Sequence, residues 1–126
     1  MVLFVCVENS NRSQMAEAFA RMHGEGEIEA RSAGSRPSGR VNPKAIEAMK
    51  EVGYDLTTHL SKGLDGFNGK DVEVAVTMGC GDECQLVIAK RRVDWQIPDP
   101  KDMTPEEFRR VRDLIEKKVK ELIASL

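Results

Sequence analysis

One short segment near the start of the chain combines a nucleophilic side chain with groups that bind anions. It runs from Cys6 to Ser13 and reads Cys-Val-Glu-Asn-Ser-Asn-Arg-Ser. The backbone N–H groups of such a tight loop can converge on one anion, and the planar guanidinium of Arg12 can bind two oxygens of the same anion. The segment therefore predicts a site where a cysteine sulfur attacks a tetrahedral oxyanion.

The elements on either side of this segment are expected to position it. Val2–Cys6 is a continuous apolar run, which is typical of a strand buried on both faces. From Gln14 to His23 the apolar residues recur at helical spacing. The N-terminus of that helix adds partial positive charge to the loop, and this charge favours a thiolate over a thiol at Cys6. The alternative is that Cys6 only ends a buried strand and that Arg12 is an ordinary surface arginine.

Periodicity places the other elements along the chain. Further strands are predicted at Ile28–Ala33, Val72–Thr77 and Val93–Gln96. A second helix is expected to begin after the cap Asn42 and to end at Gly53, and a third to run from the cap Thr104 to the C-terminus. Residues 54–71 are expected to form a loop with one short helical turn.

This alternation of strands and helices predicts a three-layer α/β/α fold with a parallel sheet. The chain of 126 residues has the size of a single domain, so we expect one domain over residues 1–126. Ligands of open parallel sheets bind at the carboxyl ends of the strands. The loop after Cys6 lies at such an end.

The composition argues against several classes of protein. The chain has 40% hydrophobic and 32% charged residues and a net charge of −2, so no basic excess points to nucleic acid as a partner. We see neither a signal peptide nor an apolar run as long as a membrane span. The sequence therefore predicts a cytoplasmic protein without a membrane partner, expected to be a monomer, whose 3 cysteines stay as thiols.

Several further segments, taken together with the loop, resemble one family. They are Ser32-Ala33-Gly34-Ser35, Val41-Asn42-Pro43, Gly53-Tyr54-Asp55-Leu56, Ser61-Lys62, Val76-Thr77-Met78-Gly79-Cys80 and Pro98-Asp99-Pro100. With Cys6, Arg12 and Ser13 they make nearly the whole chain similar to the low-molecular-weight protein tyrosine phosphatases, and more specifically to their thioredoxin-coupled arsenate reductase branch. The resemblance implies a four-stranded parallel sheet flanked by helices, flavodoxin-like in outline.

The same resemblance implies roles for the loop and for an Asp-Pro segment. Cys6 resembles the family nucleophile, Arg12 the oxyanion clamp, and Ser13 the partner of the thiolate. Asn9 resembles the residue that braces the loop and Asp99 the general acid, although aspartate before proline is also common in simple turns. The residues implied in oxyanion binding are Val7, Glu8, Asn9, Ser10, Asn11 and Arg12.

Two loop positions depart from the family pattern. Glu8 stands where the family commonly has glycine, and Asn11 stands where many members carry cysteine or another small residue. A carboxylate that faced a bound anion would repel it, so we expect the Glu8 side chain to point away from the site. Both changes bear on substrate affinity, and neither removes a catalytic group.

Cys80 and Cys84 follow the predicted strand Val72–Thr77, at the same edge of the sheet as Cys6. A phosphatase needs one cysteine, whereas a reductase needs a place for two electrons, which a cysteine pair supplies. By resemblance, Cys6 attacks arsenate, Cys80 attacks the Cys6–arsenic adduct and releases arsenite, and Cys84 then takes over the disulfide, which thioredoxin reduces. No cofactor is implied. Zinc is the competing explanation of the pair, but a structural zinc site wants four ligands, so we expect no metal.

Three functions stay open at this point. The first is thioredoxin-coupled arsenate reduction. The second is hydrolysis of phosphoesters through a phosphocysteine at Cys6, and weak activity of this kind is expected even from a reductase because the loop should accept phosphate as well as arsenate. The third is a non-catalytic phosphate- or arsenate-binding regulator whose cysteines sense oxidant. The low content of tyrosine (1) and tryptophan (1) favours a small oxyanion over a ring-bearing substrate.

Overall fold

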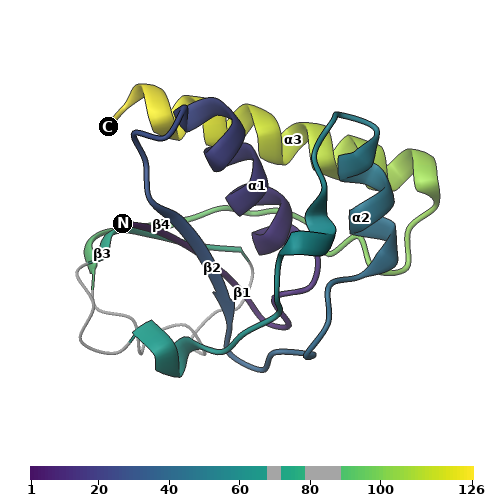
Figure 1. The fold of residues 1–126 in the computed structure, drawn as a ribbon, viewed down its shortest axis with the longest axis horizontal. Helices are drawn as coiled ribbons and strands as arrows, with labels where there is room; N and C mark the ends of the chain where they lie inside the picture. Colours follow the sequence, from purple (N-terminus) through teal and green to yellow (C-terminus); the bar gives the residue numbers. More distant parts are fainter. Residues whose placement is uncertain (68–71, 79–88) are drawn as a thin grey trace.

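Four parallel strands form one sheet in the computed structural model, which describes residues 1–67, 72–78 and 89–126 (Figure 1). The strands are β1 (Val2–Cys6), β2 (Ala30–Gly34), β3 (Val72–Thr77) and β4 (Ala89–Asp94), in the spatial order β2-β1-β3-β4. All residues of β1 are buried because this strand lies inside the sheet, between β2 and β3. The predicted four-stranded parallel sheet is therefore confirmed.

Three α-helices cover one face of this sheet (Figure 1). They are α1 (Arg12–Gly24), α2 (Pro43–Lys50) and α3 (Pro105–Ala124). The described residues between α2 and β3 include two 3₁₀-helices, η1 (Leu56–Thr58) and η2 (Leu64–Phe67). Within the described chain, η2 covers the opposite face, where Leu64 packs against Leu3 and Val5. The sheet thus lies between two layers, as the predicted α/β/α architecture requires.

The main hydrophobic core lies between the sheet and the three helices. Phe4 of β1, Phe19 of α1 and Ile115 of α3 are fully buried in it. Burial of each such side chain contributes about 1.5–3 kcal/mol to the stability of the fold. Since β1 and α1 both contribute to this core, packing fixes the two ends of the loop that joins them.

The fourth strand lies earlier in the chain than the sequence predicts. The structure has β4 at Ala89–Asp94, where the sequence indicates Val93–Gln96. Lys90, Arg91 and Arg92 are exposed because β4 is an edge strand, and charged side chains are common on edges that must not pair with another chain. Backbone pairing with β3 defines this strand, so an apolar pattern could not indicate it.

Other boundaries differ from the predictions by a few residues. The strand β2 starts at Ala30 rather than Ile28, and α1 starts at Arg12 rather than Gln14. The helix α2 ends at Lys50, and the chain turns before Gly53, whose φ of 88° is left-handed. Helix ends of this kind depend on local capping more than on apolar spacing.

Capping explains most of the helix starts. Asn42 accepts a hydrogen bond from the backbone N–H of Lys44 (2.8 Å), and Thr104 accepts one from Glu107 (3.2 Å), as predicted. Asp55 accepts one from the N–H of Thr57 (3.0 Å) and starts η1. The described part of the segment predicted as a loop with one helical turn, residues 54–67, therefore holds two 3₁₀-helices. In the described part of the chain, no helix is long and apolar enough to cross a bilayer.

Candidate active site

The loop between β1 and α1 turns its carbonyl groups toward the surrounding chain. Those of Val7, Glu8 and Ser10 accept hydrogen bonds from the N–H groups of Arg36 (2.8 Å), Ser38 (3.0 Å) and Asn42 (3.0 Å). Among the described residues, no acceptor pairs with the N–H groups of Glu8, Asn9, Ser10 or Asn11. A loop with paired carbonyls and free N–H groups forms a cradle for an anion.

A glycine of the neighbouring strand lets this loop lie so close to the sheet. A Cβ atom placed at Gly34 would stand 2.5 Å from the carbonyl oxygen of Val7 and 2.9 Å from the nitrogen of Asn9. Asn9 itself has a left-handed backbone with a φ of 50°, a conformation that asparagine tolerates better than most residues. The sequence therefore sets the loop shape through one residue inside it and one residue beneath it.

The nucleophile candidate lies on the floor of the cradle. Cys6 is 3% exposed, and its Sγ lies 2.8 Å from the Oγ of Ser13, the second residue of α1. The amide nitrogen of Asn9 donates to the same Oγ (2.8 Å). The structure therefore joins Cys6, Ser13 and Asn9, three residues that the sequence singled out, through direct hydrogen bonds.

Arg12 and Asp99 lie on segments that meet beside the loop. Arg12 is 8% exposed, and its Nη1 donates to the carbonyl oxygen of Ile97 (2.9 Å). Asp99 is exposed two residues later, and its carboxylate accepts a hydrogen bond from the N–H of Lys101 (3.0 Å). The hydrogen bond from Arg12 thus anchors the segment that carries Asp99. The Asp99 carboxylate also forms a turn contact of the kind that is common for aspartate before proline.

The two unusual loop residues have different surroundings. The Oε1 of Glu8 lies 3.7 Å from the Nζ of Lys101, and both side chains are about half exposed. This pair borders a shallow hollow of about 280 Å³ beside the loop. Asn11 is 5% exposed, and its Oδ1 is buried without a hydrogen-bond partner in the described residues. The carboxylate of Glu8 is therefore compensated by a lysine, whereas the Asn11 amide leaves a polar group unpaired inside the loop.

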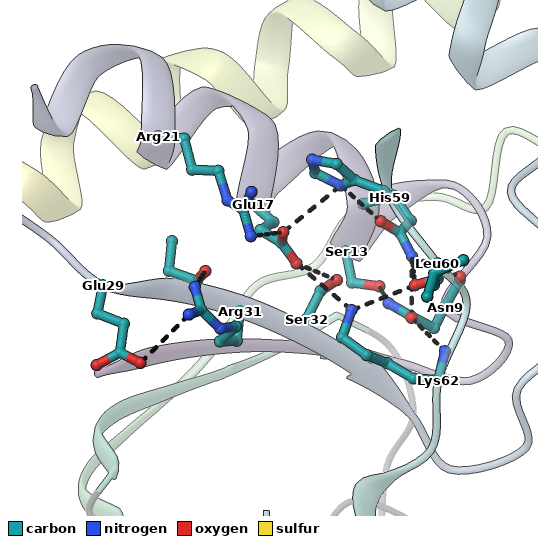
Figure 2. A network of polar contacts seen from close by, with 12 residues as sticks. Asn9, Ser13, Glu17, Arg21, Glu29, Arg31, Ser32, His59, Leu60 and Lys62 are labelled. Carbon is teal, nitrogen blue, oxygen red and sulfur yellow. Dashed lines mark hydrogen bonds and ion pairs between the residues drawn. The ribbon is translucent and has the colours of Figure 1, made fainter. Parts of the chain in front are cut away.

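A polar network behind the loop was not predicted from the sequence (Figure 2). Gln14 donates through Nε2 to the Oδ1 of Asn9 (2.9 Å) and to the carbonyl oxygen of Leu60 (2.9 Å). The backbone N–H of Lys62 donates to the same Oδ1 (2.9 Å), and the Oε1 of Gln14 faces the Nδ1 of His59 (2.9 Å). His59, Leu60 and Lys62 therefore support the loop from a distant part of the chain.

A buried carboxylate forms the other half of this network. Glu17 is 1% exposed and accepts a hydrogen bond from Ser32 of β2 (2.6 Å). Its other contacts are Arg21 Nη2 at 2.6 Å, His59 Nδ1 at 3.5 Å and Lys62 Nζ at 3.7 Å (Figure 2). Burial lowers the pKa of both His59 and Lys62, while the negative charge of Glu17 acts in the opposite direction. The sequence signal that could have indicated this network was the presence of two polar side chains, Gln14 and Glu17, on the buried face of α1.

The cysteine pair lies outside the described residues. Cys80 and Cys84 fall within 79–88, so their predicted contact with Cys6 is not described. The last described residue before this segment is Met78, whose N–H donates to the carbonyl oxygen of Val5 (2.9 Å). The described residues contain no cluster of three or more histidine, cysteine or acidic side chains that could hold a metal ion.

The fold and the loop together define the class of protein. Residues 1–126 match the family model described as low molecular weight phosphotyrosine protein phosphatase. The chain belongs to this family. The family assignment and the four-stranded parallel sheet agree with the resemblance inferred from the sequence.

Particular members of the family are similar along nearly the whole chain. The glutaredoxin arsenate reductase of Synechocystis sp. is 41% identical, over 99% of this chain and 97% of that protein. A solved structure described as an arsenate reductase in the phosphate binding state is 41% identical with a TM-score of 0.88, over 98% of this chain and 96% of that one. A thioredoxin-dependent arsenate reductase of Corynebacterium glutamicum is 31% identical with a TM-score of 0.83, over 98% of this chain and 60% of that one.

Proposed function

We propose that this protein is an arsenate reductase whose nucleophile is Cys6. One observation carries the proposal: the loop after Cys6 presents N–H groups that have no acceptor among the described residues, while its carbonyl groups are hydrogen-bonded elsewhere. Such a cradle holds a tetrahedral oxyanion directly above the sulfur. The two relatives that are 41% identical over nearly the whole chain are arsenate reductases by name, which supports arsenate as the substrate.

The first chemical step joins sulfur to arsenic. The N–H groups of the loop and the guanidinium of Arg12 bind arsenate oxygens, and Ser13 stabilises the Cys6 thiolate before it attacks. One oxygen then leaves as water, with a proton donated by Asp99. The exposed position of Asp99 and the anchoring of its segment by Arg12 support this role.

The second stage moves two electrons from sulfur to arsenic. The Cys80 thiolate attacks the Cys6 sulfur, the sulfur–arsenic bond breaks, and arsenic leaves as arsenite with the electron pair of that bond. Cys84 next attacks Cys80, which gives a Cys80–Cys84 disulfide and frees the Cys6 thiolate. An external thiol protein reduces this disulfide and restores the enzyme.

The reductant has two candidates. The sequence predicts thioredoxin, and the Corynebacterium glutamicum relative is thioredoxin-dependent by name. Glutaredoxin is the second candidate because the more similar Synechocystis relative carries that name. We expect the reaction to take place in the cytoplasm, where both reductants are maintained, and to be carried out by a monomer.

Phosphoester hydrolysis is the alternative function. The family is named for it, and an arsenate cradle should also accept phosphate. The candidate aromatic rings for holding a phosphotyrosine are engaged in packing: Trp95 lies 6.0 Å from Phe4 and Tyr54 lies 5.4 Å from His59, between ring centroids. We therefore propose weak hydrolysis of activated esters beside the reductase activity.

Arsenate-dependent oxidation of NADPH tests the proposal directly. One reaction contains thioredoxin and thioredoxin reductase, and the other contains glutaredoxin, glutathione and glutathione reductase. We expect arsenate-dependent turnover in at least one of them, and the active mixture identifies the reductant. Absence of arsenate turnover in both mixtures, with rapid ester hydrolysis, would establish the phosphatase instead.

A further inference from the structure

We propose that the ion pair between Glu8 and Lys101 holds the segment of Asp99 against the anion cradle, so that both are positioning residues for proton transfer from Asp99. The Oε1 of Glu8 lies 3.7 Å from the Nζ of Lys101. This inference rests on the proposed function, since it takes Asp99 as the proton donor. The pair joins a residue of the cradle to the chain segment that carries Asp99.

The Glu8 end of the pair is fixed to the cradle. The carbonyl oxygen of Glu8 accepts hydrogen bonds from the backbone N–H of Ser38 (3.0 Å) and from the Oγ of Ser61 (3.0 Å). Two other segments therefore hold its main chain in place. The Glu8 side chain is 44% exposed and borders the hollow beside the loop, together with Ser10 of the same loop. The carboxylate thus lies where it can contact a neighbouring segment.

The Lys101 end of the pair is fixed to Asp99. The backbone N–H of Lys101 donates to the Asp99 carboxylate (3.0 Å). The carbonyl oxygen of Lys101 accepts a hydrogen bond from the Nζ of Lys44 at the start of α2 (3.0 Å). On the other side of Asp99, Arg12 donates to the carbonyl oxygen of Ile97 (2.9 Å). A displacement of Lys101 therefore displaces Asp99 as well.

Arg12 and the Glu8–Lys101 pair hold the segment under different conditions. In the proposed mechanism Arg12 also binds the oxyanion, so its hold on Ile97 is shared with the substrate. The Glu8–Lys101 pair has no second task and can keep the segment in place while the substrate is bound. Proton transfer needs its donor within hydrogen-bond distance of the acceptor, so a small displacement of Asp99 already slows it.

The charges of the pair have a second effect, which can be separated from positioning. Glu8→Gln leaves the lysine uncompensated and should strengthen the binding of an anion in the cradle. Lys101→Met leaves the carboxylate uncompensated and should weaken it. Both variants, however, break the ion pair. We therefore expect opposite changes in anion affinity and the same change in proton transfer.

Hydrolysis of two phosphate esters measures the proton transfer. In this reaction the Cys6 thiolate attacks phosphorus, the ester bond breaks, and the Asp99 carboxyl group donates its proton to the oxygen that leaves. Phenyl phosphate needs this proton because phenolate is a strong base, whereas p-nitrophenyl phosphate releases a stable anion. The kcat/KM for phenyl phosphate divided by that for p-nitrophenyl phosphate therefore reports on Asp99, and changes in the affinity for the phosphate group cancel.

Breaking the pair should lower this ratio. We expect Glu8→Gln and Lys101→Met each to reduce it roughly two- to fivefold, because an exposed ion pair contributes little. The double variant should show the same loss as either single variant, since one pair is broken in all three. High salt screens the pair and should lower the ratio of the wild type but not that of the double variant. Inorganic phosphate, used as a competitive inhibitor, should bind more tightly to Glu8→Gln and more weakly to Lys101→Met.

Two controls connect the effect to Asp99 and to this ion pair. In an Asp99→Asn background, Glu8→Gln and Lys101→Met should cause no further loss of the ratio. Lys90→Met breaks another exposed ion pair, in which Lys90 Nζ of β4 lies 3.1 Å from Glu73 Oε1 of β3. This variant should leave the ratio unchanged.

Unchanged ratios in Glu8→Gln and Lys101→Met, a loss in only one of them, or a double variant with the product of both losses would overturn the proposal. If ester hydrolysis is too slow to measure, kcat for arsenate replaces the ratio and should fall in both variants. The proposed function can fail separately. A wild-type protein that reduces no arsenate, but whose ester ratio falls in both variants, would refute the reductase and keep the positioning role.

Discussion

Two polar clusters of this protein each pair a carboxylate with basic side chains, but they have different roles. The loop network is formed by Asn9, Gln14, Glu17, His59 and Lys62 behind the candidate active site (Figure 2), and all of these residues except Lys62 are buried. The surface cluster joins α2 to α3 through one exposed carboxylate and two arginines. Its contacts are Glu51 Oε2 to Arg109 Nη2 (2.9 Å) and Glu51 Oε1 to Arg112 Nη1 (2.7 Å).

The difference between the clusters is the access of water. In the loop network each donor has a defined acceptor, and a change at one end is transmitted to Asn9 and Ser13. In the surface cluster Glu51 and Arg109 are about half exposed, so water and salt screen their charges, whereas Arg112 is 8% exposed. The loop network should therefore control chemistry at Cys6, whereas the surface cluster should affect only the docking of two helices. The following experiments, from the largest expected effect to the smallest, test this contrast.

The largest effects are expected from the cysteines. Cys6→Ser should lower both arsenate turnover and ester hydrolysis by roughly 10³-fold or more, because a serine hydroxyl is not ionised at neutral pH. Cys80→Ser should abolish arsenate turnover to a similar extent and leave ester hydrolysis intact, since hydrolysis needs no disulfide. Steady-state assays with both substrates measure the split. Arsenate turnover that survives in Cys80→Ser would refute the relay.

The next effect concerns stability at the buried carboxylate. Glu17→Gln should destabilise the protein by about 1.5–3 kcal/mol in urea unfolding, because it weakens the hydrogen bonds that Ser32 and Arg21 donate to a buried carboxylate. Glu51→Gln is the matched change in the surface cluster and should shift the unfolding midpoint much less. Equal shifts for the two variants would remove the contrast between the clusters.

A smaller effect is expected from the contact of the loop with the sheet. Gly34→Ala should destabilise the protein by about 1–3 kcal/mol, because its Cβ would overlap the carbonyl oxygen of Val7 and displace the loop. The same displacement should lower arsenate turnover. Gly63→Ala is the matched control, since its nearest neighbour, Pro37, lies 3.6 Å away, which is an ordinary contact. A fully active Gly34→Ala variant would show that the loop needs no close approach to β2.

The smallest effects concern pH. The folded-state pKa of His59 lies below its ordinary value of 6.5 because of burial, and that of Glu51 lies below 4.5 because of its hydrogen bond with Arg109. Each group therefore contributes to the stability of the fold when the pH lies above its ordinary pKa. That contribution is lost as the pH falls through the lower pKa of the folded state. When urea unfolding is measured at decreasing pH, the stability contributed by neutral His59 should be lost before the stability contributed by Glu51. The His59→Gln variant should not show the first of these two losses. A wild-type stability that stays flat from pH 7 to about pH 5 would contradict the expectation.

Local signals predicted a large part of the fold. The apolar run Val2–Cys6, the caps Asn42 and Thr104 and the spacing in α1 each need only a few neighbouring residues, so the sequence indicates them directly. The edge strand β4 was placed too late, because exposed charged residues form it and only pairing with β3 defines it.

The candidate site likewise combines residues that the sequence indicates with contacts that it does not indicate. The sequence alone determined which residues could do chemistry, since Cys6, Asn9, Arg12 and Ser13 stand on one short segment between a strand and a helix. Only the tertiary structure decided what supports them. Glu17 of α1 contacts Ser32 of β2, and Gln14 contacts His59 across 45 positions of the chain. Contacts between distant segments depend on how the whole sheet and its helices pack, and no local pattern contains that information.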